Sequence, residues 1–285
     1  MTRSPTPLSG TAPLIDVHAH FHTDRTGKVD WSRYNDSRIS AGRRIGISCH
    51  VASVLGSWGH TSPTYFPSPE DVTYANNWMT RYAHESKGEV RAFIAVNPNH
   101  QSHAIAEITR GFANGAVGIK LAASRRADDV LLDEIGAAAA HFHAPVLHHV
   151  WQHRRRDWPN QDASDGVELA RLATRHPTVT FILAHIGGGG DYTHTFPAVR
   201  DVANVVMDLS GSGIDRGMMD EAVRWVGARR LLWAADLTLC TGLTKLRALE
   251  RMGLSADDVA DIRWRNALRI FPASSFPAVS VDGAA

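Results

Sequence analysis

The stretch Leu14-Ile15-Asp16-Val17-His18-Ala19-His20-Phe21-His22 is an apolar strand in which acidic and imidazole side chains alternate with apolar ones. An open, doubly wound α/β sheet usually has a glycine-rich phosphate loop directly after its first strand. Here the strand ends in histidines instead, and the glycine cluster of the chain, residues 187–190, comes much later. This stretch therefore favours a closed barrel over an open sheet.

Seven more short, apolar, β-branched runs follow, separated by segments with helical periodicity. Strands that alternate with helices imply crossover connections and a parallel sheet, and eight such units are typical of a (β/α)8 TIM barrel. We therefore predict an α/β fold with one domain over residues 1–285, a barrel core at about 14–272 and flexible ends. The eight predicted strands are Leu14–Phe21, Ile47–Leu55, Val90–Val96, Val117–Leu121, Pro145–Val150, Thr180–Ile186, Val205–Leu209 and Leu231–Ala235.

Helix-start signals agree with this alternation. Ser68-Pro69-Glu70-Asp71 has the pattern of a capping box with proline at the first helical position. Ser164 or Asp165 can cap a helix over Val167–Arg175, and Ser255 begins a final capping box. The sequence thus predicts helices in the gaps between the strands.

Composition limits the classes of function. The chain has 30 Lys and Arg against 29 Asp and Glu, which argues against a nucleic-acid surface or an electrostatic membrane anchor. Two cysteines cannot build a disulfide scaffold, and no window has the ~18 consecutive apolar residues of a spanning helix. We expect a cytoplasmic protein with a small-molecule substrate and no nucleic-acid or membrane partner. The sequence is compatible with a homo-oligomer. The 16 histidines are the unusual feature.

Functional side chains of a TIM barrel gather at the carboxyl ends of its strands, which form one rim. His18 and His20 project from the same face of the first strand, two residue rises of ~3.3 Å apart. Two imidazoles at that spacing can bind one divalent metal ion through bonds of ~2.0–2.1 Å. We favour this metal-binding interpretation over the alternative, an amphipathic strand whose polar face simply contacts solvent. Asp16, deeper in the strand, is expected to be a hydrogen-bonding group behind the site.

Three later strand ends carry further candidates. In the pair His148-His149, we expect His149 to face the barrel because it lies nearer the rim. His185 precedes the glycines at 187–190, which would let the backbone approach a ligand closely. Asp236 follows five apolar residues, so a buried carboxylate there would need a cation nearby, although Asp236 could instead cap the next segment.

Lys120 lies inside the fourth predicted strand, where its charge must be solvated or paired. It could reach solvent at the rim, contact a substrate anion or, as a carbamate, bridge two metal ions. With Lys120 included, five strand ends of one rim carry candidate residues. They are His18, His20, Lys120, His149, His185 and Asp236.

This set of motifs resembles the amidohydrolase superfamily, specifically the amidohydrolase-related branch that includes aminocarboxymuconate semialdehyde decarboxylase. The matching segments, in the family's order, are residues 16–20, 117–120, 145–149, 181–188, 208–211, 230–236 and 266–271. The resemblance implies a metal ion held by His18, His20, His149 and Asp236, with His185 as an acid/base or second-metal ligand.

Some features depart from the family pattern or leave it open. A small residue followed by Ser or Thr commonly precedes the last aspartate in the family, but here the pair is Ala234-Ala235. The chain also lacks room for the β-sandwich of many family hydrolases. Lys120 occupies the lysine position of binuclear members, yet single-metal relatives can also carry a lysine there. We expect zinc, with manganese, cobalt or iron as alternatives, and either one or two ions.

The expected reaction is hydrolysis of an amide, lactone or related carboxyl derivative. A bound divalent ion lowers the pKa of water from about 15.7 toward about 7, which makes hydroxide available at neutral pH. Asp236 would take the proton of that water and return it to the leaving group. His185 would orient the carbonyl or stabilise its oxyanion.

The alternative reaction is non-oxidative decarboxylation of a small unsaturated or aromatic carboxylate at the same centre. It is favoured by arginines in the loops after the fourth and fifth strands, because arginine suits carboxylate clamps. A third hypothesis, an inactive barrel that only binds a partner, predicts missing ligands, and every expected position is filled. The predicted substrate contacts are Lys120, Arg125, Trp151, His22 and Trp58.

Overall fold

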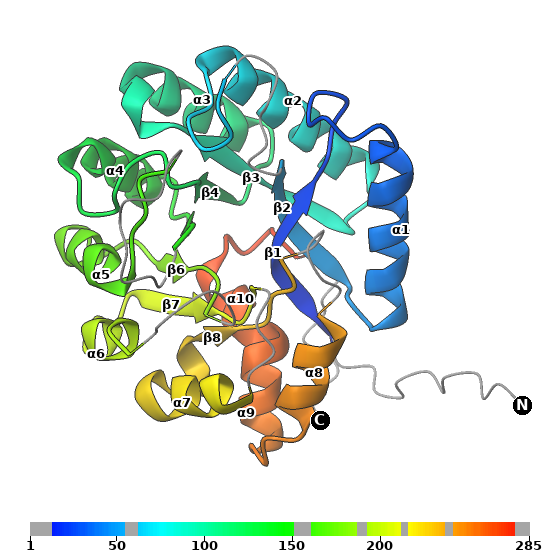
Figure 1. The fold of residues 1–285 in the computed structure, drawn as a ribbon, viewed down its shortest axis with the longest axis vertical. Helices are drawn as coiled ribbons and strands as arrows, with labels where there is room; N and C mark the ends of the chain where they lie inside the picture. Colours follow the sequence, from blue (N-terminus) through cyan, green and yellow to red (C-terminus); the bar gives the residue numbers. More distant parts are fainter. Residues whose placement is uncertain are drawn as a thin grey trace, which may run out of the picture.

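The computed structural model describes residues 13–54, 62–150, 161–186, 193–211, 216–236 and 242–276. Its strands form one parallel sheet in the order β1 to β8, and helices surround the strands (Figure 1). The predicted (β/α)8 barrel is therefore confirmed. The strands are β1 (Ile15–Phe21), β2 (Cys49–Val54), β3 (Val90–Val96), β4 (Gly118–Leu121), β5 (Val146–His148), β6 (Phe181–Leu183), β7 (Val205–Asp208) and β8 (Leu231–Leu232).

The eighth strand closes onto the first. The backbone N–H of Val17 donates to the carbonyl of Trp233, which directly follows β8, at 3.3 Å. β8 is shorter than predicted, because the residues from Trp233 to Asp236 leave the regular ladder as they approach the rim. The described helices are α1 (Trp31–Arg44), α2 (Pro69–Glu85), α3 (Gln101–Ala113), α4 (Asp133–His141), α5 (Gly166–Arg175), α6 (Thr195–Val199), α7 (Arg216–Val226), α8 (Leu243–Glu250), α9 (Ala256–Ala260) and α10 (Asn266–Ile270), with a π-helical turn, η4 (Asp261–Arg265), between the last two.

The predicted helix caps form hydrogen bonds to the first turns of their helices. Ser68 Oγ accepts the N–H of Asp71 at 3.2 Å at the start of α2. At α5 the cap is Asp165, whose side chain accepts from Val167 N, while Glu168 accepts from Asp165 N in return. Two backbone N–H groups at the start of the helix, which have no partner within the helix, thus each donate to a side chain. Ser164 instead accepts the N–H of Ala127 in the loop after β4.

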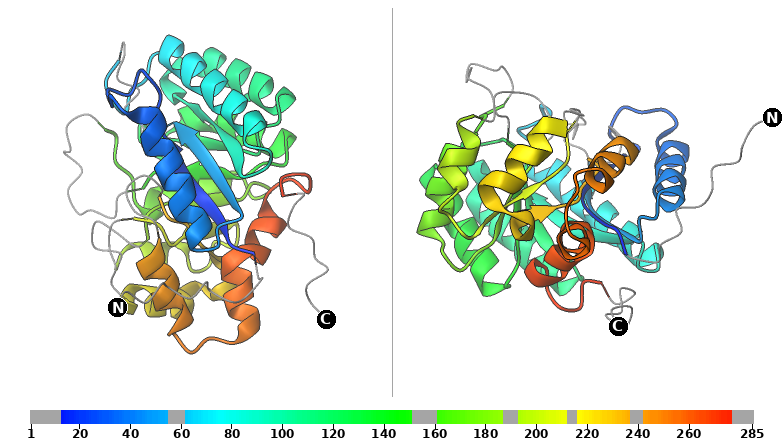
Figure 2. Two further views of the ribbon diagram at one scale, coloured as in Figure 1. Left: turned by 90° about the vertical axis from the view of Figure 1, so that its right-hand side faces the viewer. Right: turned by 90° about the horizontal axis from the view of Figure 1, so that it is seen from below.

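Apolar side chains form two cores, one on each side of the sheet. The larger core lies between the strands and the outer helices, and the smaller one fills the barrel interior. The segment from α9 to α10, coloured orange to red in Figure 2, packs beside β8. Trp264, Phe271 and Phe276 from this C-terminal region join the interior core. The interior of the barrel is therefore filled by packed apolar side chains, and polar groups lie at its rim.

A register shift in β1 decides which way its histidines face. Pairing with β2 is irregular between Asp16 and Ala19, so Val17 belongs to the interior core while Ala19 belongs to the outer one. A bulge of this kind lets consecutive residues face the same side and re-aims a side chain. His18 and His20 thereby point into the barrel mouth. Among the described residues, no helix has the length and apolar character needed to span a bilayer.

Candidate metal centre and active site

Three of the predicted ligands meet at the barrel mouth. The ligand atoms of His18, His20 and Asp236 all lie within 4.8 Å of one another, and the three residues are buried. His18 Nε2 lies 3.0 Å from His20 Nε2, and Asp236 Oδ1 lies 3.9 Å and 3.5 Å from these two nitrogens. Residues from the two ends of the chain thus form one cluster, because β8 closes onto β1.

The far sides of the two imidazoles are held by side chains of neighbouring strands. His18 Nδ1 lies 2.8 Å from Asp208 Oδ2 at the end of β7, and His20 Nδ1 lies 3.0 Å from Ser53 Oγ on β2. A carboxylate only accepts hydrogen bonds, so Nδ1 of His18 carries the proton. Its Nε2 lone pair therefore points into the cluster, which is the arrangement of a metal-binding histidine.

Lys120 places a positive charge inside this cluster. Its Nζ lies 2.9 Å from His18 Nε2, and the residue is only 2% exposed, so the ammonium does not reach solvent at the rim. Burial lowers the pKa of Lys120 to about 8, while the charges of Asp236 and Asp208 oppose that shift.

His185 lies on the other side of Asp236. Its Nε2 is 3.4 Å from Asp236 Oδ2, and its Nδ1 is 3.1 Å from the carbonyl of Val150, a pairing that gives Nδ1 the proton. The backbone φ of His185 is +65° and that of Asp236 is +52°, both in the left-handed region that non-glycine residues rarely adopt. Such conformations cluster at functional sites.

His149 is next to His185 rather than in the group of three ligands. The two ring centroids are 4.5 Å apart, with the rings at 77° to each other. His149 therefore lies beside His185, but it is not a member of the compact group formed by His18, His20 and Asp236. His148 lies on the opposite side of β5, where the charge of Glu168 on α5 acts on it.

Burial sets the protonation states of the site. It lowers the pKa of His18, His20 and His149 well below the usual value, and nearby cationic groups add to the effect. Burial likewise lowers the pKa of His185 to about 4. The imidazoles are therefore neutral at neutral pH, which is the form that binds metals. Burial raises the pKa of Asp236 to about 7, and Lys120 counteracts this shift.

The predicted substrate contacts are only partly described. His22 is buried, exchanges hydrogen bonds with Asn35 on α1 and packs edge-on against Tyr34. Arg125 lies in the loop after β4, where its Nε is 3.5 Å from Asp129 Oδ2. Trp58, Trp151 and the glycines at 187–190 lie outside the described residues.

Several residues at the site escaped the sequence analysis. Asp208 and Ser210 belong to a segment that stands out in the sequence only as a family motif, and Ser53 is one serine in an apolar strand. Tyr65, in the loop after β2, has its ring centroid 5.4 Å from that of His149. Burial raises the pKa of the Tyr65 phenol, and the charge of Asp236 adds to this. No spacing or periodicity in the sequence singles out Tyr65.

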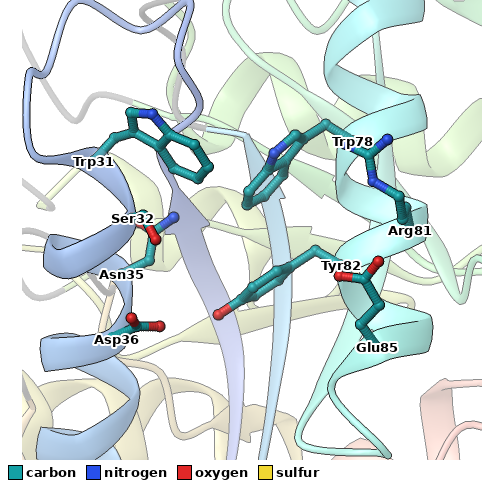
Figure 3. Close-up of a pocket in the computed structure, with 8 residues that line it drawn as sticks. All are labelled: Trp31, Ser32, Asn35, Asp36, Trp78, Arg81, Tyr82 and Glu85. Carbon is teal, nitrogen blue, oxygen red and sulfur yellow. The ribbon is translucent and has the colours of Figure 1, made fainter.

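A separate cavity of about 260 Å³ lies in the helical layer between α1 and α2 (Figure 3). Trp31 from α1 faces Trp78 and Tyr82 from α2 across it, and Asp36 and Glu85 lie at its edges (Figure 3). None of the described residues predicted for the site lines this cavity. The candidate centre is thus at the strand ends and not between the helices.

The donor set at the barrel mouth fits a divalent cation. Two imidazoles and one carboxylate converge, and nitrogen and oxygen ligands of this kind suit zinc, manganese or iron. Asp236 Oδ1 is buried and accepts no hydrogen bond from any described residue, so it has a lone pair available.

The sequence pattern of the family described as amidohydrolase matches residues 15–273, whereas no curated protein matches the chain by sequence. Solved structures with a similar fold include 2,6-dihydroxybenzoate decarboxylase from Rhizobium, with a TM-score of 0.70, 16% identity and coverage of 90% of this chain and 98% of that one.

Two further decarboxylases have similar folds. One is 5-carboxyvanillate decarboxylase from Sphingomonas paucimobilis, with a TM-score of 0.69, 14% identity and coverage of 91% and 99% of the two chains. The other is a dihydroxybenzoic acid decarboxylase from a Polaromonas species with bound manganese and the inhibitor 2-nitroresorcinol. It has a TM-score of 0.69, 18% identity and coverage of 90% and 96%.

Proposed function

Because the chain belongs to the amidohydrolase family, we propose that it is a metal-dependent, non-oxidative decarboxylase of a small aromatic or unsaturated carboxylate. Support comes first from the similar structures, whose names describe decarboxylases of hydroxylated benzoates. It comes also from the buried side chain of Lys120 at the barrel mouth. This reading replaces hydrolysis, the reaction expected from the sequence, as the leading hypothesis.

The observation that carries the proposal is the buried ammonium of Lys120, 2.9 Å from His18 Nε2. A fixed positive charge in a dry site attracts an anionic substrate far more strongly than it would in water. A carboxylate substrate offers such an anion, whereas a neutral amide or lactone has no charge for Lys120 to bind. Arg125 in the loop after β4 is proposed as a second contact to the substrate. Trp58, Trp151 and His22 are proposed to pack against it.

The reaction needs one proton and one place for an electron pair. The bond between the carboxylate carbon and its neighbour breaks, carbon dioxide leaves, and the electron pair stays on the neighbouring carbon until a proton adds there. His185 Nε2 and Asp236 Oδ2, 3.4 Å apart, form the pair proposed to hold and deliver that proton. Burial keeps competing water away from both groups.

A divalent ion held by His18, His20 and Asp236, with His149 as a proposed additional ligand, would supply charge that stabilises the electron pair. Manganese is the first ion to test, because one similar structure contains it. Zinc, the ion expected from the sequence, is the second. Lys120 lies close enough to His18 to contact a substrate oxygen bound at the same centre.

The proposal is tested by product analysis. Protein reconstituted with manganese is incubated with 2,6-dihydroxybenzoate and 5-carboxyvanillate, and released carbon dioxide and the decarboxylated phenol are measured. The Asp236→Asn variant is the control, since it removes the proposed proton carrier and one ligand. Carbon dioxide release by the parent protein and not by the variant supports decarboxylation. Turnover of amides or lactones by the same preparation, without carbon dioxide release, would reject it.

Hydrolysis is the second candidate function, and the family description favours it. The same residues would then act on a water molecule, with Asp236 as base and His185 as the group that stabilises the oxyanion. Incorporation of labelled oxygen from water into the product distinguishes the two reactions, because decarboxylation puts a water-derived proton, and no oxygen, on the product carbon.

A further inference from the structure

Asp208, the last residue of β7, accepts three hydrogen bonds at the back of the candidate centre. Its Oδ2 lies 2.8 Å from His18 Nδ1, and its Oδ1 accepts the backbone N–H groups of His185 at 3.0 Å and Ser210 at 2.9 Å. The residue is fully buried. One carboxylate therefore contacts a proposed metal ligand and the backbone of the proposed proton carrier.

We propose that Asp208 is the positioning residue of this centre: it fixes the tautomer of His18 and the backbone conformation of His185 at the same time. The inference rests on the proposed metal centre and adds the residue that orients two of its members. Asp208 touches no reacting atom in this role. It acts through His18 and His185.

The effect on His18 follows from the chemistry of the two oxygens. A buried carboxylate accepts the proton of Nδ1, which leaves Nε2 as a bare lone pair directed at His20 and Asp236. The hydroxyl of Ser210, 3.1 Å from the same Nδ1, can accept or donate and imposes no tautomer by itself. Asp208 is thus the group that fixes His18 in the Nδ1–H tautomer, in which Nε2 can bind a cation.

The effect on His185 is a matter of backbone geometry. With φ at +65°, its peptide is in a conformation that a histidine adopts only when surrounding contacts enforce it. The hydrogen bond from His185 N to Asp208 Oδ1 is such a contact, because it spans from β6 to β7 at the rim. It holds the ring of His185 where Nε2 meets Asp236.

The chain offers a matched control in Asp16. This carboxylate is also fully buried and also accepts two backbone N–H groups, from His18 at 3.2 Å and Ala235 at 2.9 Å, together with one imidazole. That imidazole, however, belongs to His50, which is not a proposed ligand. Asp16→Asn and Asp208→Asn therefore make the same chemical change. Both leave an oxygen that can accept the two backbone N–H groups, and only the second alters the side-chain partner of a proposed ligand.

Asp208→Asn is the informative variant. The amide oxygen can keep the two backbone hydrogen bonds, and the amide nitrogen then faces His18 Nδ1 as a donor. This forces the proton of His18 onto Nε2, the wrong tautomer for binding a cation. The side-chain shape is unchanged, so the fold is expected to persist.

The first measurement needs no metal. In protein labelled with nitrogen-15 in its histidines, long-range proton–nitrogen spectra report the tautomer of each ring, and a His18→Gln variant assigns the His18 signals. We expect the Nδ1–H tautomer in the parent and in Asp16→Asn, and the Nε2–H tautomer in Asp208→Asn. An Nε2–H tautomer in the parent, or the same tautomer in all three proteins, overturns the inference.

The second measurement is titration of each protein with manganese chloride in a calorimeter. Loss of a residue that orients a metal-binding histidine typically weakens metal affinity about 10–100-fold, so we expect that change in Asp208→Asn. For Asp16→Asn we expect no such weakening, because the imidazole that it contacts, His50, is not a proposed ligand. Equal weakening in both variants would overturn the positioning role. A parent that shows the expected tautomer but binds no manganese would instead refute the proposed function.

Discussion

Asp16 Oδ1 accepts the backbone N–H of Ala235 at 2.9 Å, which joins the first strand of the barrel to the residue before Asp236. The two residues are 219 positions apart in sequence. Since Asp236 itself has a left-handed backbone, this contact helps to fix the direction in which its carboxylate points. The cluster with His18 and His20 depends on that direction.

Replacement of Asp236 by asparagine is expected to abolish metal binding and activity while the fold remains. The amide keeps the volume of the side chain but removes the charge that would balance a cation next to two neutral imidazoles. Calorimetry with manganese and circular dichroism of the metal-free protein test both parts. Wild-type affinity in this variant would show that Asp236 is not a ligand.

Acid should destabilise the protein in part through Glu107 on α3. Burial pushes the pKa of Glu107 upward, but hydrogen bonds from Arg110, Asn76 and Thr73 outweigh it and hold that pKa below the usual range. A carboxyl whose folded pKa is lowered stabilises the fold above its unfolded pKa and loses that contribution as the pH falls through the folded value.

The Glu107→Gln variant measures this contribution. Its free energy of unfolding should fall below that of the parent at pH 7, and the difference should shrink as the pH is lowered below about 4, near the ordinary pKa of glutamate. Urea unfolding at a series of pH values gives the two curves. Curves that stay parallel over the whole pH range would mean that the pKa of Glu107 is the same in the folded and unfolded protein.

Gly242, before α8, is expected to resist substitution more strongly than Gly253. Both have left-handed backbones, with φ of +74° and +73°, but a Cβ on Gly242 would lie 2.5 Å from the ring of Trp233, whereas nothing lies within 4 Å at Gly253. Gly253→Ala should cost about 1–2 kcal/mol of backbone strain. Gly242→Ala should cost about 1–3 kcal/mol more, because it overpacks the core. Chemical denaturation of both variants tests this, and equal losses would contradict it.

Cys49 should be unreactive in the folded protein. It is buried at the start of β2, and burial raises the pKa of its thiol to about 12, so almost no thiolate is present at pH 8. In a Cys240→Ser background, a thiol reagent is expected to modify no cysteine until guanidinium is added. Rapid reaction of the native protein would show that β2 opens readily.

The barrel was predictable because strand–helix alternation repeats along nearly the whole chain. The convergence of His18, His20 and Asp236 was predictable too, because a closed parallel barrel brings strand ends to one rim. The hydrogen-bond partners of these residues were not predictable. Asp208 reaches His18 across 190 positions, and nothing in a single sequence indicates such a pairing. The position of His149 beside His185 depends on how β5 ends, which periodicity does not specify.

The irregular pairing in β1 makes the length of that strand part of the chemistry. Adding one residue between Asp16 and His18 would exchange the sides of the strand beyond that point. Both imidazoles would then be directed at the helical layer and Phe21 at the barrel mouth, although every proposed metal ligand would still be present in the sequence. Mutagenesis libraries for this protein should therefore vary side chains in this segment but preserve its residue count.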